Sequence, residues 1–520
     1  MIESVDRRRL EVGESEPASR PYDAIVVGAG MSGLSSGMIL AKEGMRVLVL
    51  EQHDRIGGYL HRFFRKGGVQ FDVGFHYVGG VEPGQVLGRY LAYCGVADRL
   101  ELIPFDPTGF DELRFPDRRV LVPAGYEQYR ERLLEAFPNE RAGIDAYCRI
   151  LPQVVDGFAF YRLRATQDTA HSDRWMSTPL GQLLDGLIGD AALKAVLCGH
   201  SPLYGVEPRR TPVALHALVT DTYMQNPYTF RGGGDRLTQC MGQRLEEAGG
   251  EIRTGRLVAA ILLGADHRVR GVRTEQGEEF LAPLVVSSAH PKVTLSLLPL
   301  EVLGPASRRR LSRMEDGVGT VSVYVTTQVD LTHYRGRNIY NYKTTDIDGL
   351  YAGHPGEPGR PFAFVTVPSA REGVTEDGRH LVTGFGLMRY AEVARWAETR
   401  VGARGAEYEE IKARAAEEIL ALIVDAVPEL KGHIVSVEAA TPLTNRDYSM
   451  SAGGAAYGLH HSVEQTGRMG LKPRTRIPGL HLTGQSVLFP GVCGVTISAF
   501  HTAAGILGAD YLMDKVRQAA

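Results

Sequence analysis

The sequence predicts an α/β fold in which a parallel sheet is assembled from distant parts of the chain and joined to a second domain of mixed sheet and helices. Three observations predict it. A strand–helix–strand unit lies near the N-terminus, a glycine-rich turn lies inside that unit, and a further strand, glycine and helix follow one another near the C-terminus. The first two together are typical of nucleotide-binding α/β folds.

The N-terminal unit begins with a short apolar run at 22–27, which is typical of a buried parallel strand. Residues 31–44 have the spacing of a helix with small residues on one face, and 46–50 form a second apolar strand. The unit has the length that a βαβ unit requires. It predicts part of a Rossmann-like FAD-binding domain.

The turn after the first strand comprises Gly28, Ala29, Gly30, Met31, Ser32 and Gly33. Gly28 permits a tight turn, Gly30 lets the backbone approach a pyrophosphate, and Gly33 lets helix and strand pack closely. The helix N-terminus at Met31 and Ser32 offers unpaired N–H groups to phosphate oxygens. A glycine turn without a ligand is the alternative, and its sequence context argues against it.

The ligand of this turn is predicted to be FAD. Glu51 ends the second strand, where its carboxylate can accept hydrogen bonds from both ribose hydroxyls and repel the extra phosphate of NADP. A second glycine pair, Gly57 and Gly58, follows Glu51 and Gln52 and can approach a long dinucleotide again. Near the C-terminus a strand ends at Gly484 and Gln485, and the helix after it, 490–507, contains Val495 and can face the flavin.

The other expected elements define the domains. Helices are expected at 126–161, interrupted by Pro138, and at 179–221, 237–248 and 407–427, and strands at 251–253, 257–262, 269–273, 284–286, 320–327, 362–367 and 380–386. We predict a disordered tail at 1–20, an FAD-binding domain from 21–115, 230–300 and 470–515, and a substrate-binding domain with a helical insertion from 116–229 and 301–469. Residues 232–234 form a further glycine run, but no apolar strand is expected before it.

Composition restricts the partners and the compartment. The 58 basic and 61 acidic residues give a net charge of −3 without a basic stripe, so no nucleic-acid partner is predicted. The five cysteines are far apart, which predicts neither disulfides nor a metal site and favours a cytoplasmic protein. Prolines and glycines interrupt 477–509, so no membrane-spanning helix is expected there. An aromatic cluster at Phe158, Phe160, Tyr161, Trp175 and Met176 suits either helical core, which we favour, or contact with the inner face of a membrane.

From residue 22 to about 508, the chain resembles the superfamily of flavoproteins that contains phytoene desaturases, carotenoid isomerases and retinol saturases. The stretch from 232–237 (Gly-Gly-Gly-Asp-Arg-Leu) to 289–291 (Ala-His-Pro) is similar to its central FAD-domain region. The resemblance places Val258 where the backbone contacts adenine. It also implies the amine-oxidase and phytoene-desaturase type of two-domain fold.

Within this superfamily the chain most resembles the retinol saturase branch. The segments that carry this similarity are 71–79 (Phe-Asp-Val-Gly-Phe-His-Tyr-Val-Gly), 441–448 (Thr-Pro-Leu-Thr-Asn-Arg-Asp-Tyr), 456–458 (Ala-Tyr-Gly) and 483–485 (Thr-Gly-Gln). The first of them places Gly74 near the flavin. Tyr59 departs from the branch, which usually has cysteine there, and 487–491 is closer to carotenoid isomerases.

The resemblance implies hydride transfer at flavin N5 to or from a C=C bond of a long apolar polyene or isoprenoid-like lipid. We favour saturation, with desaturation and isomerisation left open, and expect an external electron donor or acceptor. His76, Tyr77 and Tyr457 are candidate proton donors, although each also suits a packing role. Two rival functions remain: a flavin amine oxidase, and a non-enzymatic lipid-binding escort for prenylated proteins.

Overall fold

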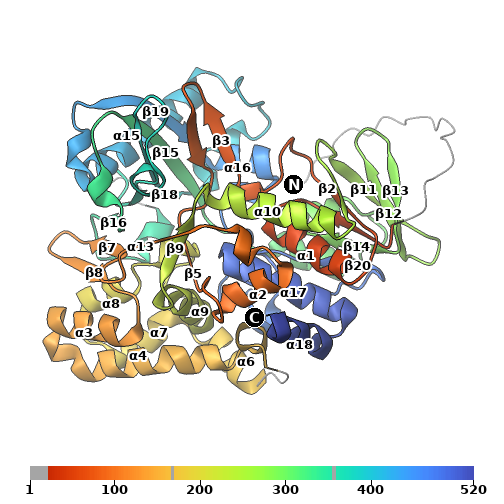
Figure 1. The fold of residues 1–520 in the computed structure, drawn as a ribbon, viewed down its shortest axis with the longest axis horizontal. Helices are drawn as coiled ribbons and strands as arrows, with labels where there is room; N and C mark the ends of the chain where they lie inside the picture. The colour runs from red at the N-terminus through yellow and green to blue at the C-terminus, as the bar shows by residue number, and fades with distance from the viewer. Residues whose placement is uncertain (1–21, 165–168, 354–358, 520) are drawn as a thin grey trace.

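The computed structural model describes residues 22–164, 169–353 and 359–519 (Figure 1). The tail predicted at 1–20 lies outside the described residues. The α/β fold predicted from the sequence is confirmed, with one parallel sheet and one mixed sheet as its two largest sheets. Within the described residues no helix is both long and apolar enough to cross a membrane.

The parallel sheet has five strands from three distant parts of the chain. Their order is β10 (Glu251–Arg253), β2 (Val47–Leu50), β1 (Ala24–Val27), β14 (Leu284–Ser287) and β20 (Leu480–Leu482), and every pair is parallel. All residues of β1 and β2 are buried, as expected for apolar strands covered on both faces. Each strand falls in one of the three segments predicted to form the FAD-binding domain.

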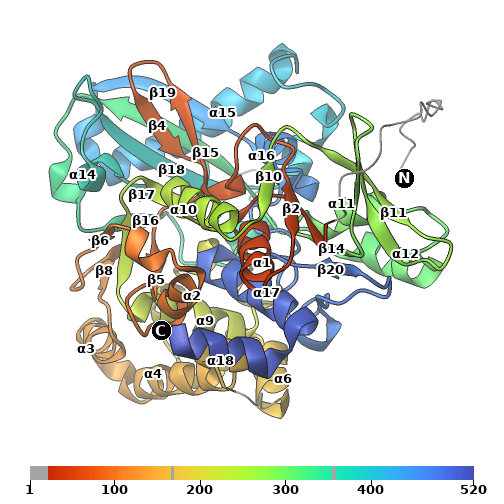
Figure 2. The same cartoon turned by 45° about the vertical axis from the view of Figure 1, so that its right-hand side comes forward.

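A group of helices that pack against one another lies beside the parallel sheet. They are α1 (Met31–Lys42), α2 (Val86–Cys94), α10 (Gly233–Glu247), α17 (Gly491–Leu507) and α18 (Ala509–Ala519). Helix α1 packs against both α10 and α17, beside the sheet in both views (Figures 1 and 2). Gly37 makes this possible, because a Cβ there would lie 2.7 Å from Leu245 Cδ1 of α10 and 3.0 Å from Val49 Cγ2.

The mixed sheet has seven strands. Their order is β19 (Ile434–Ala440), β15 (Gly319–Thr327), β18 (His380–Met388), β17 (Phe362–Thr366), β16 (Asn338–Tyr342), β7 (Asp111–Arg114) and β8 (Arg119–Val122). Only the β16–β7 pair is parallel. Helix α15 (Ala406–Ala426) packs on the sheet through Ile419 and Ile423, which lie against Gly386 and Gly384. The predicted domain limit at 115 falls inside the β7–β8 hairpin.

A group of helices lies below the mixed sheet in Figure 1. It comprises α3 (Tyr126–Ala136), α4 (Arg141–Asp156), α5 (Ala159–Arg162), α6 (Thr169–Ser177), α7 (Leu180–Leu187), α8 (Ala191–Leu197) and α9 (Val213–Met224). As expected, the break between α3 and α4 begins at Pro138. The aromatic cluster Phe158, Phe160, Tyr161, Trp175 and Met176 belongs to or packs against the main hydrophobic core. Tyr161 is buried, the other four are partly buried, and all but Trp175 also line the large cavity described below.

The remaining elements are short. They are the hairpin β3 (Arg62–Arg65) and β4 (Val69–Asp72), the sheet β5 (Val78–Gly79), β9 (Pro227–Phe230) and β6 (Leu102–Pro104), the sheet β11 (Val258–Leu263), β12 (Val269–Thr274) and β13 (Glu279–Leu281), and helices α11 (Pro291–Ser296), α12 (Pro305–Arg313), α13 (Gly349–Ala352), α14 (Ser369–Glu372) and α16 (Pro442–Ser449). The expectation that no strand precedes 232–234 is wrong, because β9 does. This strand is antiparallel to its neighbours, and a Cβ on Gly233 would lie 2.2 Å from Asp72 Oδ1. These glycines let α10 approach the β3–β4 hairpin.

Candidate functional site

One large cavity of about 1090 Å³ runs between the parallel sheet, the mixed sheet and the helical region. Its volume is at the upper limit for a site that holds one small molecule, so it has room for a cofactor and a substrate together. The predicted cofactor residues that line it are Gly28, Gly30, Met31, Ser32, Glu51, Gln52, Gly57, Gly58, Gly74, Val258, Gly484, Gln485 and Val495. His76, Tyr77 and Tyr457 line it as well, whereas Gly33 does not.

The three glycines of the first turn have different surroundings. Gly28 has a φ of +96°, which favours glycine, and a Cβ on Gly33 would lie 1.9 Å from the Gly28 carbonyl oxygen. Gly33 therefore brings helix α1 onto the turn. A Cβ on Gly30 would meet no heavy atom within 4 Å. Gly30 borders the cavity, so this open space can receive a phosphate group at the backbone.

Two helices begin at the cavity with their first N–H groups available. Helix α1 has no side-chain cap and no acidic residue in its first turn, and neither has α17. Uncapped helix N-termini favour anions. Ser32 Oγ lies 2.8 Å from Thr483 Oγ1, so a hydrogen bond holds the C-terminal segment against the start of α1.

Glu51 is buried beside the glycine turns. Its carboxylate accepts hydrogen bonds from Ala29 N at 2.7 Å and His53 N at 2.9 Å. An ionised carboxylate offers about four acceptor positions, so ribose hydroxyls can still bind it. The second turn lies against the first, because Gly57 N donates to Ala29 O at 2.8 Å and a Cβ on Gly58 would lie 3.3 Å from Gly30 Cα. The two turns thus form one continuous backbone surface.

His76 is held in an aromatic environment. Its ring lies 4.8 Å from the ring of Phe364 and 5.7 Å from that of Phe385. Burial, with a smaller contribution from the Arg371 cation, lowers the pKa of His76 to about 4. The imidazole is therefore neutral at neutral pH and is a poor proton donor there.

This buried imidazole predicts a pH-dependent stability. The folded-state pKa of about 4 lies below the ordinary value of 6.5, so the unfolded chain binds more protons between these two pH values. Lowering the pH from 6.5 to 4 should therefore reduce the free energy of unfolding. His76→Gln should lose less over this range than the wild type in urea unfolding, and His333→Gln, a change at an exposed position, should not. Parallel pH dependence in all three proteins would contradict this assignment.

Tyr77 joins a buried hydrogen-bond network that the sequence did not reveal. Its hydroxyl donates to Asp111 Oδ2 at 2.7 Å and lies 2.7 Å from the hydroxyl of Tyr340. Asp111 is fully buried, and it also binds His200 Nε2 at 2.9 Å and accepts from Asn338 Nδ2 at 3.0 Å. Burial and the Asp111 charge raise the pKa of Tyr77 well above its usual value. The phenol is therefore neutral and fixed in position.

The hydroxyl of Tyr457 points to the protein backbone, because it donates to Pro202 O at 2.7 Å. Gly205 leaves room for the ring, since a Cβ there would lie 2.4 Å from Tyr457 Cδ2. Tyr59, noted in the sequence only as a departure, also lines the cavity. The Tyr59 hydroxyl donates to Ala455 O at 3.0 Å and accepts from Ser449 Oγ at 2.9 Å. The hydroxyls of Tyr457 and Tyr59 therefore both hold chain segments that form the cavity wall.

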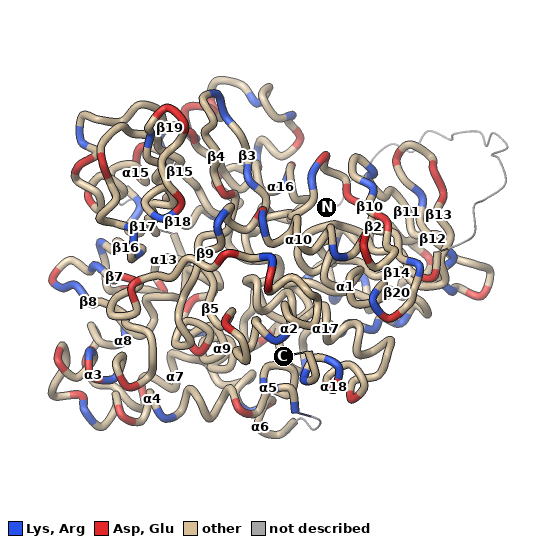
Figure 3. The backbone as a smooth tube through the Cα atoms, in the orientation of Figure 1, with Lys and Arg blue, Asp and Glu red and all other residues tan. Residues whose placement is uncertain are grey.

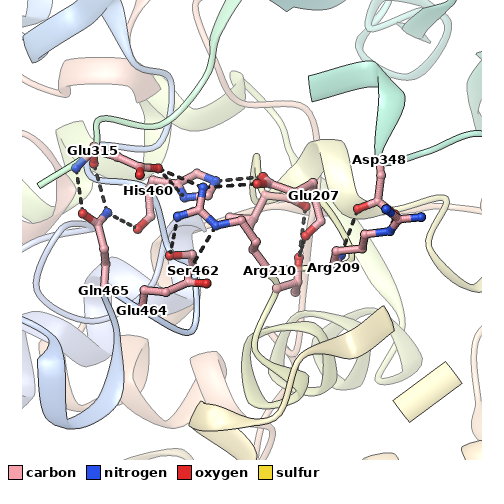
Figure 4. A network of polar contacts seen from close by, with 11 residues as sticks. Glu207, Arg209, Arg210, Glu315, Asp348, His460, Ser462, Glu464 and Gln465 are labelled. Atoms are coloured by element: carbon pink, nitrogen blue, oxygen red, sulfur yellow. Dashed lines mark hydrogen bonds and ion pairs between the residues drawn. The ribbon is translucent and has the colours of Figure 1, made fainter. Parts of the chain in front are cut away.

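A network of charged side chains fixes another part of the wall (Figure 4). His460 Nε2 lies 2.9 Å from Glu207 Oε2, and Arg210 pairs with Glu315 at 2.9 Å and Glu464 at 3.2 Å. His460 lines the cavity, as does the nearby Gln465. The network ties the helical region to the segment after β19. It was not predictable, because its members lie far apart in the sequence.

Comparisons with known proteins agree with this geometry. The family model described as flavin containing amine oxidoreductase matches residues 31–507. The all-trans-retinol 13,14-reductase of Rattus norvegicus is 32% identical over 93% of this chain and 85% of its own, and prolycopene isomerase 2 of an Oncidium hybrid cultivar is 26% identical over 98% and 88%. The structure of cyclohexylamine oxidase from Brevibacterium oxydans covers 96% of this chain and 100% of its own with a TM-score of 0.61 at 16% identity.

These findings confirm the predicted resemblance to the retinol saturase branch and its superfamily. The family model covers more than half of the chain, and residues of the two glycine turns and Glu51 line the cavity. Because the sequence identity to the amine oxidase structure is low, the similarity between the two structures supports the fold alone. The chain therefore belongs to the flavin-containing amine oxidoreductase family and is a flavin-dependent oxidoreductase.

Proposed function

We propose that the flavin is FAD and that it lies along the glycine turns. Several features fit a dinucleotide better than a mononucleotide. Glu51 suits a ribose, the N-terminus of α1 suits a pyrophosphate, and Val258 borders the same cavity for adenine. Gly484, Gln485 and the start of α17 would then contact the flavin end. When bound and reduced, FAD supplies a hydride to one carbon of a substrate C=C bond.

We further infer that the protein is a saturase, which reduces a C=C bond of an apolar polyene or isoprenoid-like lipid. The observation that carries this proposal is the 32% identity over 93% of the chain to a retinol 13,14-reductase. The cavity supports it, since its substrate part is lined by apolar side chains that include Leu215, Leu218, Phe385, Phe489 and Ile497. Such a lining excludes water and suits a long hydrocarbon chain.

Reduction also needs a proton for the second carbon, and we propose Tyr77 as its source. His76 is neutral, and the hydroxyl of Tyr457 is bound to a backbone carbonyl. Tyr77 differs from both because its hydroxyl is hydrogen-bonded to Asp111, which in turn binds His200. As Tyr77 gives its proton to the substrate carbon, the hydrogen-bonded pair of Asp111 and His200 can relay a replacement proton to the phenolate oxygen, which leaves no buried tyrosinate beside a carboxylate.

Isomerisation is the second candidate, favoured by the 26% identity over 98% of the chain to a prolycopene isomerase. It uses the same cavity and the same flavin but gives no net reduction. The Tyr77 network would then serve to hold the wall of the cavity. Both candidate reactions take the same class of substrate. They differ in that saturation oxidises the reduced flavin, whereas isomerisation leaves its oxidation state unchanged.

An anaerobic single-turnover experiment decides between these reactions. The enzyme is reduced with dithionite, freed of excess reductant and mixed with all-trans-retinol or a polycis-carotene. A saturase should oxidise one flavin for each double bond reduced, as seen in the visible flavin absorbance and in a product mass increased by two hydrogens. Isomerised product formed while the flavin stays reduced would replace the saturase proposal with the isomerase. The oxidised enzyme mixed with the same lipids is the control and should give no reduced product.

A further inference from the structure

A strongly basic surface lies on two neighbouring segments, and we call it the basic rim. Its cations are Arg308, Arg309, Arg310 and Arg313 on α12 and Arg468, Lys472, Arg474 and Arg476 in the loop 467–476. All eight residues are exposed. Neither 304–313 nor 467–476 contains an aspartate or a glutamate. Along most of the rest of the backbone, basic and acidic residues are interspersed (Figure 3).

The two segments are adjacent in space. Arg310 donates hydrogen bonds to the carbonyl oxygens of Met469 and Gly470, which joins α12 to the loop. In the part of the chain that the structure describes, only Arg468 of the eight cations has an ion pair, with Asp173 at 2.7 Å. The remaining seven charges are therefore not neutralised by acidic side chains. Positive charge on this scale, uncompensated at a surface, indicates an anionic partner.

The basic rim borders the cavity. Lys472 and Arg474 are both exposed and line it, together with Gly467, Gly470 and Leu471. On the inner side lies His501, whose ring is 4.9 Å from that of Phe160, and both residues line the same cavity. Burial first, and then the Lys472 cation, lowers the pKa of His501, which places Lys472 close to this point. Two cations of the basic rim, Lys472 and Arg474, thus lie at the edge of the cavity, beside the aromatic side chain of Phe160.

Apolar side chains are exposed among these cations. Met469, in the same loop, is 60% exposed, and Leu300, just before α12, is 68% exposed. A mixture of cations and exposed apolar groups is typical of surfaces that rest on a lipid headgroup layer. An acidic protein surface would match the charge, but it would not explain why two of the cations, Lys472 and Arg474, line the cavity proposed for an apolar substrate.

We propose that the basic rim docks on an anionic bilayer, so that apolar substrate passes from the membrane into the cavity. The proposal rests on the proposed function in one respect, namely that the substrate is a lipid. Phosphate groups of acidic lipids would neutralise the arginines of α12 and the cations of the loop, while Met469 enters the headgroup region. Helix α6 adjoins the loop of the basic rim, because Asp173 pairs with Arg468 and Met176 lies against Gly467.

Vesicle sedimentation of the flavin-loaded protein tests the docking directly. We expect binding to vesicles that contain phosphatidylglycerol, weaker binding at high salt, and little binding to pure phosphatidylcholine. The triple variant Arg308→Gln, Arg309→Gln and Arg313→Gln spares Arg310, which holds the loop. It should bind about a hundredfold more weakly, since each cation near an anionic surface contributes roughly fivefold.

The matched control removes three exposed arginines elsewhere, with Arg141→Gln, Arg149→Gln and Arg414→Gln. It has the same net charge as the test variant and should bind like the wild type. Equal loss in both variants, or no wild-type binding to phosphatidylglycerol vesicles, would overturn the proposal. Turnover of detergent-dispersed substrate should be unchanged in the test variant. Vesicle binding without any C=C reduction would reject the proposed reaction and leave the docking surface standing.

Discussion

Gly30→Ala is expected to give a folded protein that has lost most of its flavin. The backbone of Gly30 has φ −69° and ψ 173°, which alanine adopts without strain, and no heavy atom lies within 4 Å of the added Cβ. The methyl group would instead occupy the space that we assign to a phosphate. Overpacking of this kind costs about 1–3 kcal/mol, or roughly 10- to 100-fold in the dissociation constant. Visible flavin absorbance after purification and a fluorescence titration of the apoprotein measure the effect.

Two further variants make this result specific. Gly186→Ala, in α7, adds the same methyl group where a Cβ also meets nothing within 4 Å, but outside the cavity, and it should retain the flavin. Gly33→Ala places a Cβ 1.9 Å from the Gly28 carbonyl oxygen and should lower the melting temperature as well. If Gly30→Ala bound flavin as tightly as the wild type, the phosphate could not lie at this position.

Tyr77→Phe is expected to slow C=C reduction by about a hundredfold or more while leaving the flavin bound. A positioned general acid contributes about 10²–10⁴-fold to a rate. Phenylalanine keeps the ring that stacks on Tyr223 at 4.6 Å, and Asp111 keeps its bonds to His200 and Asn338. The measurement is the rate of flavin reoxidation by substrate under anaerobic conditions. In deuterium oxide, the wild type should add deuterium to one face of the product, and the variant should lose this selectivity.

Tyr340→Phe is the matched control for this experiment. It removes a hydroxyl from the same network, 2.7 Å from that of Tyr77, but Tyr340 does not line the cavity. It should therefore slow the reaction far less and keep the selectivity for one face. His200→Gln should slow repeated turnover, because the relay through Asp111 that restores the proton of Tyr77 is interrupted. Equal effects of Tyr77→Phe and Tyr340→Phe would indicate a purely structural network.

Local sequence signals predicted the parallel sheet and most of its surroundings. Strands β1 and β2 are short apolar runs on either side of a glycine turn, a pattern that depends only on near neighbours. The strand, glycine and helix near the C-terminus indicated Gly484, whereas the position of Val258 needed the family resemblance, since it has no local signal of its own. Helix α10 begins at Gly233 rather than at Leu237, because the glycines there approach the β3–β4 hairpin. Such a tertiary contact overrides the low helix propensity of glycine.

The hydrogen-bond network around Tyr77 could not be predicted from the sequence. Asp111 and Asn338 are neighbours only because β7 and β16 pair in parallel, with these two residues in register. His200 reaches Asp111 from the helical region, 89 positions away. None of these residues lies in a motif, so their joint role follows from packing of distant segments and not from any spacing along the chain. The basic rim has the same origin, since the α12–loop contact joins residues 159 positions apart.

The order of strands in the parallel sheet has a consequence for biosynthesis. Strand β14 lies between β1, near the start of the chain, and β20, near its end. The hydrogen bond between Ser32 and Thr483 and the whole of α17 can form only after residues 480–507 have left the ribosome. Contacts between such distant residues form slowly. Residues 480–507 must therefore be synthesised before the parallel sheet is complete, and the cofactor site proposed here can form only after that point.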